Sequence, residues 1–149
     1  MKERLDVAFS SRPCPMVELR HELPDGSHHI DWMLARDPDG REPLVSFRLE
    51  RPLLELLGAI EAWETAKAQR IQDHRPKYLE YEGPISRNRG HVRRVSSGTV
   101  EMVKAGDHPC GVVLRLTWRL PGSEPCPPVR VHLRPETDDQ WLIERLESA

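Results

Sequence analysis

Turn-forming residues divide this chain into short segments, and this division constrains the fold more than any other feature of the sequence. Fourteen of the 149 residues are proline and nine are glycine. Because proline has no backbone N–H and is excluded from central strands, the segments between successive prolines are limited to short elements. Short strands at regular spacing are typical of an antiparallel sandwich or barrel. The recurring prolines are Pro15, Pro24, Pro43, Pro52, Pro76, Pro84, Pro109, Pro121 and Pro135.

Several of these segments alternate apolar and polar residues, as half-buried strands do. The clearest is 111–120, where Val113, Arg115, Thr117 and Arg119 alternate with apolar neighbours. We predict a mostly β protein, a compact antiparallel β-barrel of about eight short strands. The expected strands are 16–23, 28–36, 43–50, 68–73, 78–82, 97–104, 111–120, 129–133 and 140–146.

One segment has helical spacing instead. Apolar residues recur every three or four positions after Pro52, at Leu53, Leu56, Leu57, Ile60 and Trp63. Proline suits the first turn of a helix. We predict one amphipathic helix over about residues 53–70, packed on or capping the barrel, with its apolar stripe in the core.

Length and composition indicate one domain. Residues 1–15 lack periodicity and are expected to be a flexible lead-in, with a single domain over 16–149. No apolar run reaches the length of a membrane span, and three widely spaced cysteines are typical of reduced thiols in a cytoplasmic protein. The net charge of −2 means that any nucleic-acid binding must use a local basic patch.

The most informative stretch surrounds a turn of Pro24, Asp25 and Gly26. Proline presets φ for the first turn residue, and glycine accepts a left-handed third position. This is typical of a three-residue hairpin loop. Such a loop pairs Leu23 with Ser27, and therefore places His21 opposite His29.

This register predicts a metal site. Directly opposite residues share a face of the sheet, and Asp31 lies two residues beyond His29 on that same face. Two histidines and one carboxylate with open positions are a common arrangement for a divalent metal. The alternative is that these polar residues merely decorate a surface hairpin. A loop of two or four residues would turn His21 to the opposite face.

The same stretch belongs to a set of blocks that resembles the 3′-phosphoesterase domain of bacterial DNA ligase D and its small stand-alone relatives. Residues 21–34 (HELPDGSHHIDWML) are similar to H-x-x-P-x-G-x-H-x-D-x-M-L, with one extra residue before His29. Residues 73–83 (DHRPKYLEYEG) resemble D-H-x-x-x-Y-x-x-(F/Y)-E-G. Weaker matches follow the family order at 46–49 (SFRL), 97–100 (SGTV) and 141–143 (WLI). Together the blocks run from about residue 20 to residue 145.

The resemblance implies a compact β-barrel whose manganese-dependent site heals DNA 3′ ends, removing a terminal ribonucleoside and then the 3′-phosphate. Carried over by position, it implies metal ligands at His21, His29 and Asp31. It implies phosphate contact by His74, with Tyr78 beside it, and it places Arg51 near a family lysine.

Two departures from the family pattern bear on activity. The family arginine two residues after the metal aspartate is Met33 here, although the stand-alone relatives share this methionine. The helical segment of about 53–68 replaces what is usually an irregular loop.

A basic stretch directly follows the second block. Arg87, Arg89, Arg93 and Arg94 lie within nine residues. Arginines beside a metal suit a nucleic-acid backbone, so we favour phosphate contact over an ordinary solvated loop.

These observations predict a metal-dependent phosphoesterase that processes nucleic-acid 3′ ends in DNA repair. The expected cofactor is Mn²⁺, with Zn²⁺ or another divalent ion as the alternative. The expected partner is a DNA 3′ end rather than RNA, with a ligase or polymerase as a separate protein and no membrane. One alternative is a non-catalytic metal- or nucleic-acid-binding module, because Met33 replaces the phosphate-clamping arginine. Another is a small barrel scaffold with incidental histidines.

Overall fold

The computed structural model describes residues 9–58, 64–105 and 111–146. Strands dominate, and the described residues include one short α-helix and one short 3₁₀ turn. In chain order the elements are β1 (Cys14–Glu22), β2 (His28–Leu34), β3 (Leu44–Leu49), α1 (Leu53–Gly58), β4 (Thr65–His74), η2 (Pro76–Leu79), β5 (Gly83–Pro84), β6 (His91–Ala105), β7 (Val112–Arg119), β8 (Val129–Pro135) and β9 (Gln140–Arg145).

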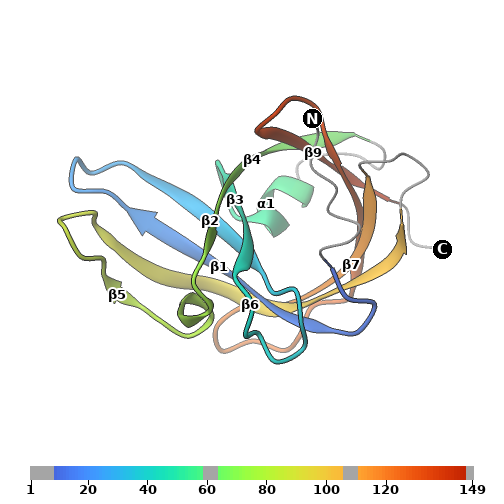
Figure 1. Ribbon diagram of the computed structural model, residues 1–149, viewed down its shortest axis with the longest axis horizontal. Coiled ribbons are helices and arrows are strands. Elements are labelled where there is room, and N and C mark those ends of the chain that lie inside the picture. The colour runs from blue at the N-terminus through green and yellow to red at the C-terminus, as the bar shows by residue number, and fades with distance from the viewer. Residues whose placement is uncertain (1–8, 59–63, 106–110, 147–149) are drawn as a thin grey trace.

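The strands form one antiparallel sheet that closes on itself. The order is β1-β2-β3-β4-β9-β8-β7-β6-β5, and a further pairing of β1 with β6 completes the ring. Eight strands therefore make the ring, and β5 lies outside it as a partner of β6 (Figure 1). The predicted antiparallel, mostly β fold is confirmed. None of the described helices has the length and apolar character needed to cross a membrane.

The predicted helix over 53–70 is wrong in its extent. α1 covers only Leu53–Gly58, and β4 already begins at Thr65; Ile60 and Trp63 lie outside the described residues. β4 alternates buried and exposed residues, but its buried positions are Ala66 and Ala68. Alanine has a low strand propensity, so these two residues did not indicate a strand. The helical spacing of the leucines before them therefore led to the prediction of a helix up to residue 70. Hydrogen bonding to β3 on one side and to β9 on the other makes this segment a strand.

Two other expected boundaries also differ. The segment 78–82, expected as a strand, begins within the 3₁₀ turn η2 and lies mostly outside regular structure. The expected lead-in of 1–15 overlaps the fold, because β1 begins at Cys14 and the side chain of Phe9 is buried. Ser10 and Pro15 also accept backbone hydrogen bonds from Met102 and Ala35.

Large aromatic side chains fill the interior of the ring. Phe47 packs between Trp32 and Trp141, with ring centroids 5.7 and 5.9 Å away. Edge and tilted contacts of this kind are the preferred aromatic arrangements. The three tryptophans in the described residues are all buried core residues; Trp63 lies outside these residues.

A buried carboxylate fixes α1 to this interior. Glu18 is only 1% exposed. Its side chain accepts hydrogen bonds from the Leu53 backbone N–H at 2.7 Å and from the Ser96 hydroxyl at 2.8 Å. Burial raises the pKa of Glu18 above its ordinary value, although these two hydrogen bonds favour the ionised form.

This environment makes part of the stability depend on pH. Because the folded-state pKa of Glu18 is raised, its contribution is complete below the unfolded pKa of about 4.5 and is lost as pH rises through the folded value. We expect Glu18→Gln to gain stability relative to the wild type as pH rises from 4 to 8. Urea unfolding at several pH values measures the difference. Glu124→Gln, at an exposed position, is the control, and its free energy of unfolding relative to the wild type should not vary with pH. If the difference between Glu18→Gln and the wild type were equally independent of pH, the prediction would be contradicted.

Two hairpin arms extend from one side of the ring. The β1–β2 hairpin forms one arm, and the β5–β6 hairpin forms the other (Figure 1). β1 pairs with both β2 and β6, so it joins the two arms. The predicted metal ligands lie on the first arm and the predicted basic stretch lies on the second.

Candidate metal centre

The turn of the first arm has the predicted three-residue form. Leu23 and Ser27 flank the loop, with the Leu23 N–H donating to the Ser27 carbonyl at 2.8 Å. Gly26 has φ 90°, the left-handed conformation that this turn requires. The Asp25 carboxylate accepts from the Ser27 hydroxyl at 2.6 Å and from the Ser27 N–H at 2.9 Å. These two hydrogen bonds stabilise the turn and hold the pKa of Asp25 below its ordinary value. The resulting register pairs His21 with His29, as predicted.

Two imidazoles and one carboxylate therefore converge. His21 Nδ1 lies 3.2 Å from His29 Nε2, His29 Nε2 lies 3.1 Å from Asp31 Oδ1, and His21 Nδ1 lies 3.6 Å from Asp31 Oδ2. Ligand atoms about 2.1 Å from a tetrahedral ion lie about 3.4 Å from one another. The cluster has this spacing, and it could hold a metal ion.

The hydrogen-bonding state of the cluster also fits a cation. Asp31 is 3% exposed, and its Oδ1 is buried with no hydrogen-bond partner in the described part of the chain. Although Oδ1 is near His29 Nε2, the two groups are not aligned as a hydrogen bond. A buried carboxylate oxygen without a donor is unfavourable unless another positive group neutralises it. A bound divalent ion would satisfy this oxygen.

The second arm orients His21 through a backbone carbonyl. His21 Nε2 lies 2.7 Å from the Arg89 carbonyl oxygen, which can only accept, so the ring carries its proton on Nε2. In the neutral ring, Nδ1 then presents a lone pair to the cluster. Metal-binding histidines commonly donate their other N–H to a carbonyl in this way, which fixes the tautomer and the ring orientation.

Gly90 allows this contact because it brings the second arm against the end of β1. A Cβ at Gly90 would lie 1.8 Å from the Glu22 carbonyl oxygen, and the residue has φ 91°. The loop before it is closed by the Arg89 side chain, which donates to the Ser86 carbonyl at 2.8 Å and contacts the Ser86 hydroxyl at 3.2 Å. Arg87 and Asn88 also adopt positive φ.

A cleft of about 630 Å³ lies between the arms and η2. It brings together His21, Asp31, His74, Tyr78, Arg87 and Arg89 among the residues predicted from the sequence. Residues that sequence reasoning missed also line it, chiefly Gln72, Arg75, Lys77 and Tyr81. Arg75, Lys77 and Tyr81 lie within the block from Asp73 to Gly83, and Gln72 directly precedes it, so considering every polar residue of that block and its flank would have found them.

His74 and Tyr78 form one wall of the cleft. Their ring centroids lie 5.7 Å apart, edge to face. His74 Nδ1 lies 2.9 Å from the Gln72 carbonyl oxygen and therefore carries a proton. In the neutral ring, Nε2 is then left as the hydrogen-bond acceptor. The Lys77 ammonium lies over the Tyr78 ring at 5.2 Å, which places positive charge at this wall.

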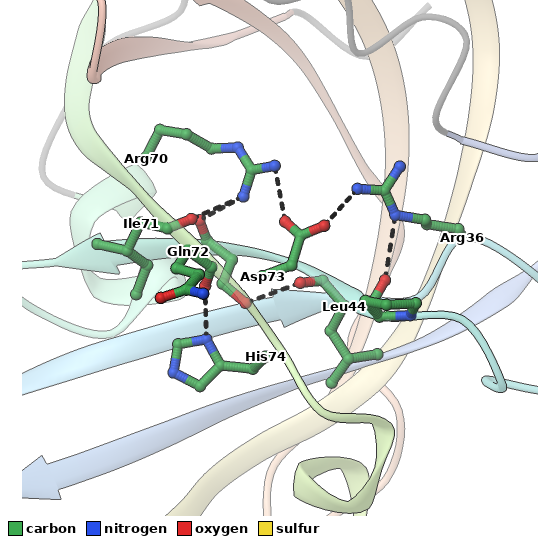
Figure 2. A network of polar contacts seen from close by, with 9 residues as sticks. Arg36, Leu44, Arg70, Ile71, Gln72, Asp73 and His74 are labelled. Carbon is green, nitrogen blue, oxygen red and sulfur yellow. Dashed lines mark hydrogen bonds and ion pairs between the residues drawn. The ribbon is translucent and has the colours of Figure 1, made fainter.

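An arginine–aspartate–arginine bridge supports the strand that carries His74. Figure 2 shows Asp73 between Arg36 and Arg70, at 2.6 and 2.7 Å. Arg70 also donates to the Ser46 and Ile71 carbonyls. Partial burial alone would raise the pKa of Asp73, but the hydrogen bonds from Arg70 and Arg36 outweigh it and lower the pKa. The bridge therefore fixes β4 immediately before His74.

We expect Asp73→Asn to destabilise the protein by about 1–3 kcal/mol at neutral pH, because two partly buried guanidinium groups lose their counter-charge. Since the folded-state pKa is lowered, the wild-type contribution is present above the unfolded pKa of about 3.8 and is lost as pH falls through the folded value. Chemical denaturation of both proteins from pH 2 to 7 measures this. If the free energies of unfolding of the wild type and Asp73→Asn differed equally at pH 2 and pH 7, the charge of Asp73 would not be responsible for the difference.

Four predicted residues do not line the cleft: His29, which belongs to the metal-ligand cluster, and Arg51, Arg93 and Arg94. Arg51 faces solvent near α1 and pairs with Glu55 at 3.4 Å. Arg93 and Arg94 line a separate groove. Arg48, which was not predicted, is the cross-strand partner of Asp31 and therefore points to the same face of the sheet. The register between β2 and β3 reveals Arg48. The turn signal at 37–40 (DPDG) does not fix that register, because it lies within the longer connection from Leu34 to Leu44.

Comparison with known proteins finds no family model and no curated protein that matches this chain.

Proposed function

We propose that this protein is a metal-dependent phosphoesterase that processes the 3′ ends of nucleic acids. The observation that carries the proposal is the convergence of His21, His29 and Asp31, with a buried unsatisfied carboxylate oxygen, at a cleft lined by cationic side chains. Phosphate esters are anionic, and their hydrolysis requires charge neutralisation around the transferred group. The resemblance of residues 21–34 and 73–83 to the 3′-phosphoesterase domain favours DNA 3′ ends as substrate and Mn²⁺ as cofactor.

Each wall of the cleft would have a distinct role. His21, His29 and Asp31 would hold the ion, which when bound supplies Lewis-acid polarisation of a phosphate oxygen. His74 Nε2 would accept a hydrogen bond from an attacking water, or in its protonated state donate one to the phosphate. Arg75, Lys77 and Arg87 line the cleft, and no carboxylate in the described residues pairs with any of them. These cations would neutralise the phosphate.

One observation favours a second candidate function. Met33 is 1% exposed and lines the cleft two residues after Asp31, so an apolar side chain occupies the position of the family's phosphate-clamping arginine. A cleft that has the candidate metal ligands but lacks the phosphate-binding arginine suits a non-catalytic metal- or nucleic-acid-binding module. The three unpaired cations across the cleft weigh toward catalysis.

A denaturing-gel assay tests the proposal. The substrates are primer–templates that end in a 3′-phosphate or in a single 3′-ribonucleotide, with Mn²⁺ or with a chelator, and Asp31→Ala is the control. We expect Mn²⁺-dependent trimming that Asp31→Ala abolishes. Metal binding without trimming of either substrate would instead support the binding module. A separate ligase or polymerase would use the trimmed end.

A further inference from the structure

A second basic hollow lies beside the cleft. A groove of about 450 Å³ is lined by Glu82, Arg93, Arg94, Ser97, Arg119 and Leu120, with Pro121 at its edge. Three guanidinium groups and one carboxylate face it, so its local charge is positive although the whole chain is slightly acidic. Arg93 and Arg119 are exposed, and no carboxylate in the described part of the chain pairs with either.

The groove and the cleft share one thin wall. Tyr81 and Pro84 line the cleft, whereas Glu82 between them lines the groove. Arg94 holds this wall in place: its guanidinium donates to the Leu79 carbonyl at 2.9 Å, and its backbone N–H donates to the Glu82 carboxylate at 2.9 Å. Because these bonds tie up Arg94 and Glu82, the free cations of the groove are Arg93 and Arg119.

The spacing of the two hollows fits a polynucleotide. Val92 lines the cleft and Ser97 lines the groove on the same strand, β6. Arg93, which also lines the groove, follows Val92 directly, and Ser97 lies five residues beyond Val92. The groove therefore extends from about 3 Å to roughly 17 Å beyond the cleft along β6, which equals about one to five nucleotide steps at 3.4 Å along a duplex. A strand whose 3′ end lies in the cleft would therefore bring backbone phosphates to the groove.

We propose that this groove binds the phosphate backbone of the substrate strand within about five nucleotides of its 3′ end, with Arg93 as the contact nearer the cleft and Arg119, which pairs with Ser97, as the farther one. The proposal rests on the proposed function and extends it. It makes the substrate a polynucleotide rather than a small phosphate ester. Phosphate contacts from arginine set affinity without reading sequence, so the contribution of the groove depends on length and on salt.

The test measures binding of 5′-labelled DNA by fluorescence anisotropy with a chelator in place of Mn²⁺, so that the end is not trimmed. The DNA carries a 3′-phosphate on a duplex of about 20 base pairs or on a fragment of about two nucleotides. We expect Arg119→Gln and Arg93→Gln each to weaken binding of the duplex and to lower its salt slope by about 1. Arg119→Gln should leave binding of the short fragment unchanged, because Arg119 lies opposite Ser97 at the far end of the groove. Arg134→Gln, a partly exposed arginine outside both hollows, is the matched control and should alter neither substrate.

Other outcomes would overturn the proposal. Unchanged duplex binding in both variants would show that the groove does not contact DNA. Equal weakening of long and short substrates would show that the arginines act within the cleft. Failure of the proposed function has a different signature: length-dependent binding would persist while no 3′ end is trimmed.

Discussion

Replacing Asp31 by asparagine should abolish metal-dependent stabilisation of this protein. The carboxylate is buried, and its oxygens lie 3.1 and 3.6 Å from the two histidine nitrogens. Loss of an indirect metal contact typically costs 10–100-fold in affinity, so loss of a charged ligand should cost more than about 100-fold. For the wild type, metal at about 100 times its Kd adds about 2.7 kcal/mol, or about 5–10 °C in Tm for a domain of this size. Thermal unfolding with increasing Mn²⁺ or Zn²⁺ measures both proteins.

Asp39→Asn is a suitable control for this experiment. Asp39 is exposed on a turn and is not part of the cluster, so its variant should respond to metal as the wild type does. An equal rise in Tm for Asp31→Asn would place the metal elsewhere. The choice of asparagine keeps the size of the side chain, so that a lost response reports lost charge rather than a cavity.

Gly90→Ala should damage both stability and the metal centre. A left-handed backbone costs alanine about 1–2 kcal/mol. The added Cβ would also lie 1.8 Å from the Glu22 carbonyl oxygen, so the second arm must move away from β1. We therefore expect a loss of more than about 2 kcal/mol in the free energy of unfolding. Movement of the arm also withdraws the Arg89 carbonyl from His21, which should weaken metal binding by about 10–100-fold.

Gly122→Ala separates the two causes. Gly122 has φ 74°, but a Cβ there would meet nothing within 4 Å. Gly122→Ala should therefore lose only the stability that the left-handed backbone costs an alanine, and it should keep the wild-type metal affinity. Denaturant unfolding and metal titration of the two variants give the comparison. If Gly90→Ala were no worse than Gly122→Ala, close approach of the arms would not matter to the site.

Local turn chemistry explains why the convergence of the three candidate ligands could be predicted from sequence. Pro24, Asp25 and Gly26 fix a three-residue loop, and that loop alone sets the register of His21, His29 and Asp31. No comparable signal fixes how the second arm meets the first. The contact of Arg89 with His21 joins residues 68 positions apart and uses a backbone carbonyl, which has no residue-type signature.

The helix prediction failed for a related reason. Leu53, Leu56 and Leu57 do form a buried helical face, so the start of the pattern was correctly interpreted. Its continuation to residue 70 could not be tested from the sequence, because Ala66 and Ala68 are compatible with either a helix or a strand. The neighbouring strands β3 and β9 decide the conformation there, and their identity depends on the closed ring.

The join between β1 and β6 has a consequence for how the protein assembles. This join closes the ring between residues 14–22 and 91–100, which are distant in sequence, and long-range pairing of this kind is slow to form. The hairpin can bring the three ligands together early, because they lie within eleven consecutive residues. His21 receives its orienting carbonyl only when the join forms. Full affinity of the proposed metal site would therefore be a property of the completed ring, and a newly made chain would acquire it last.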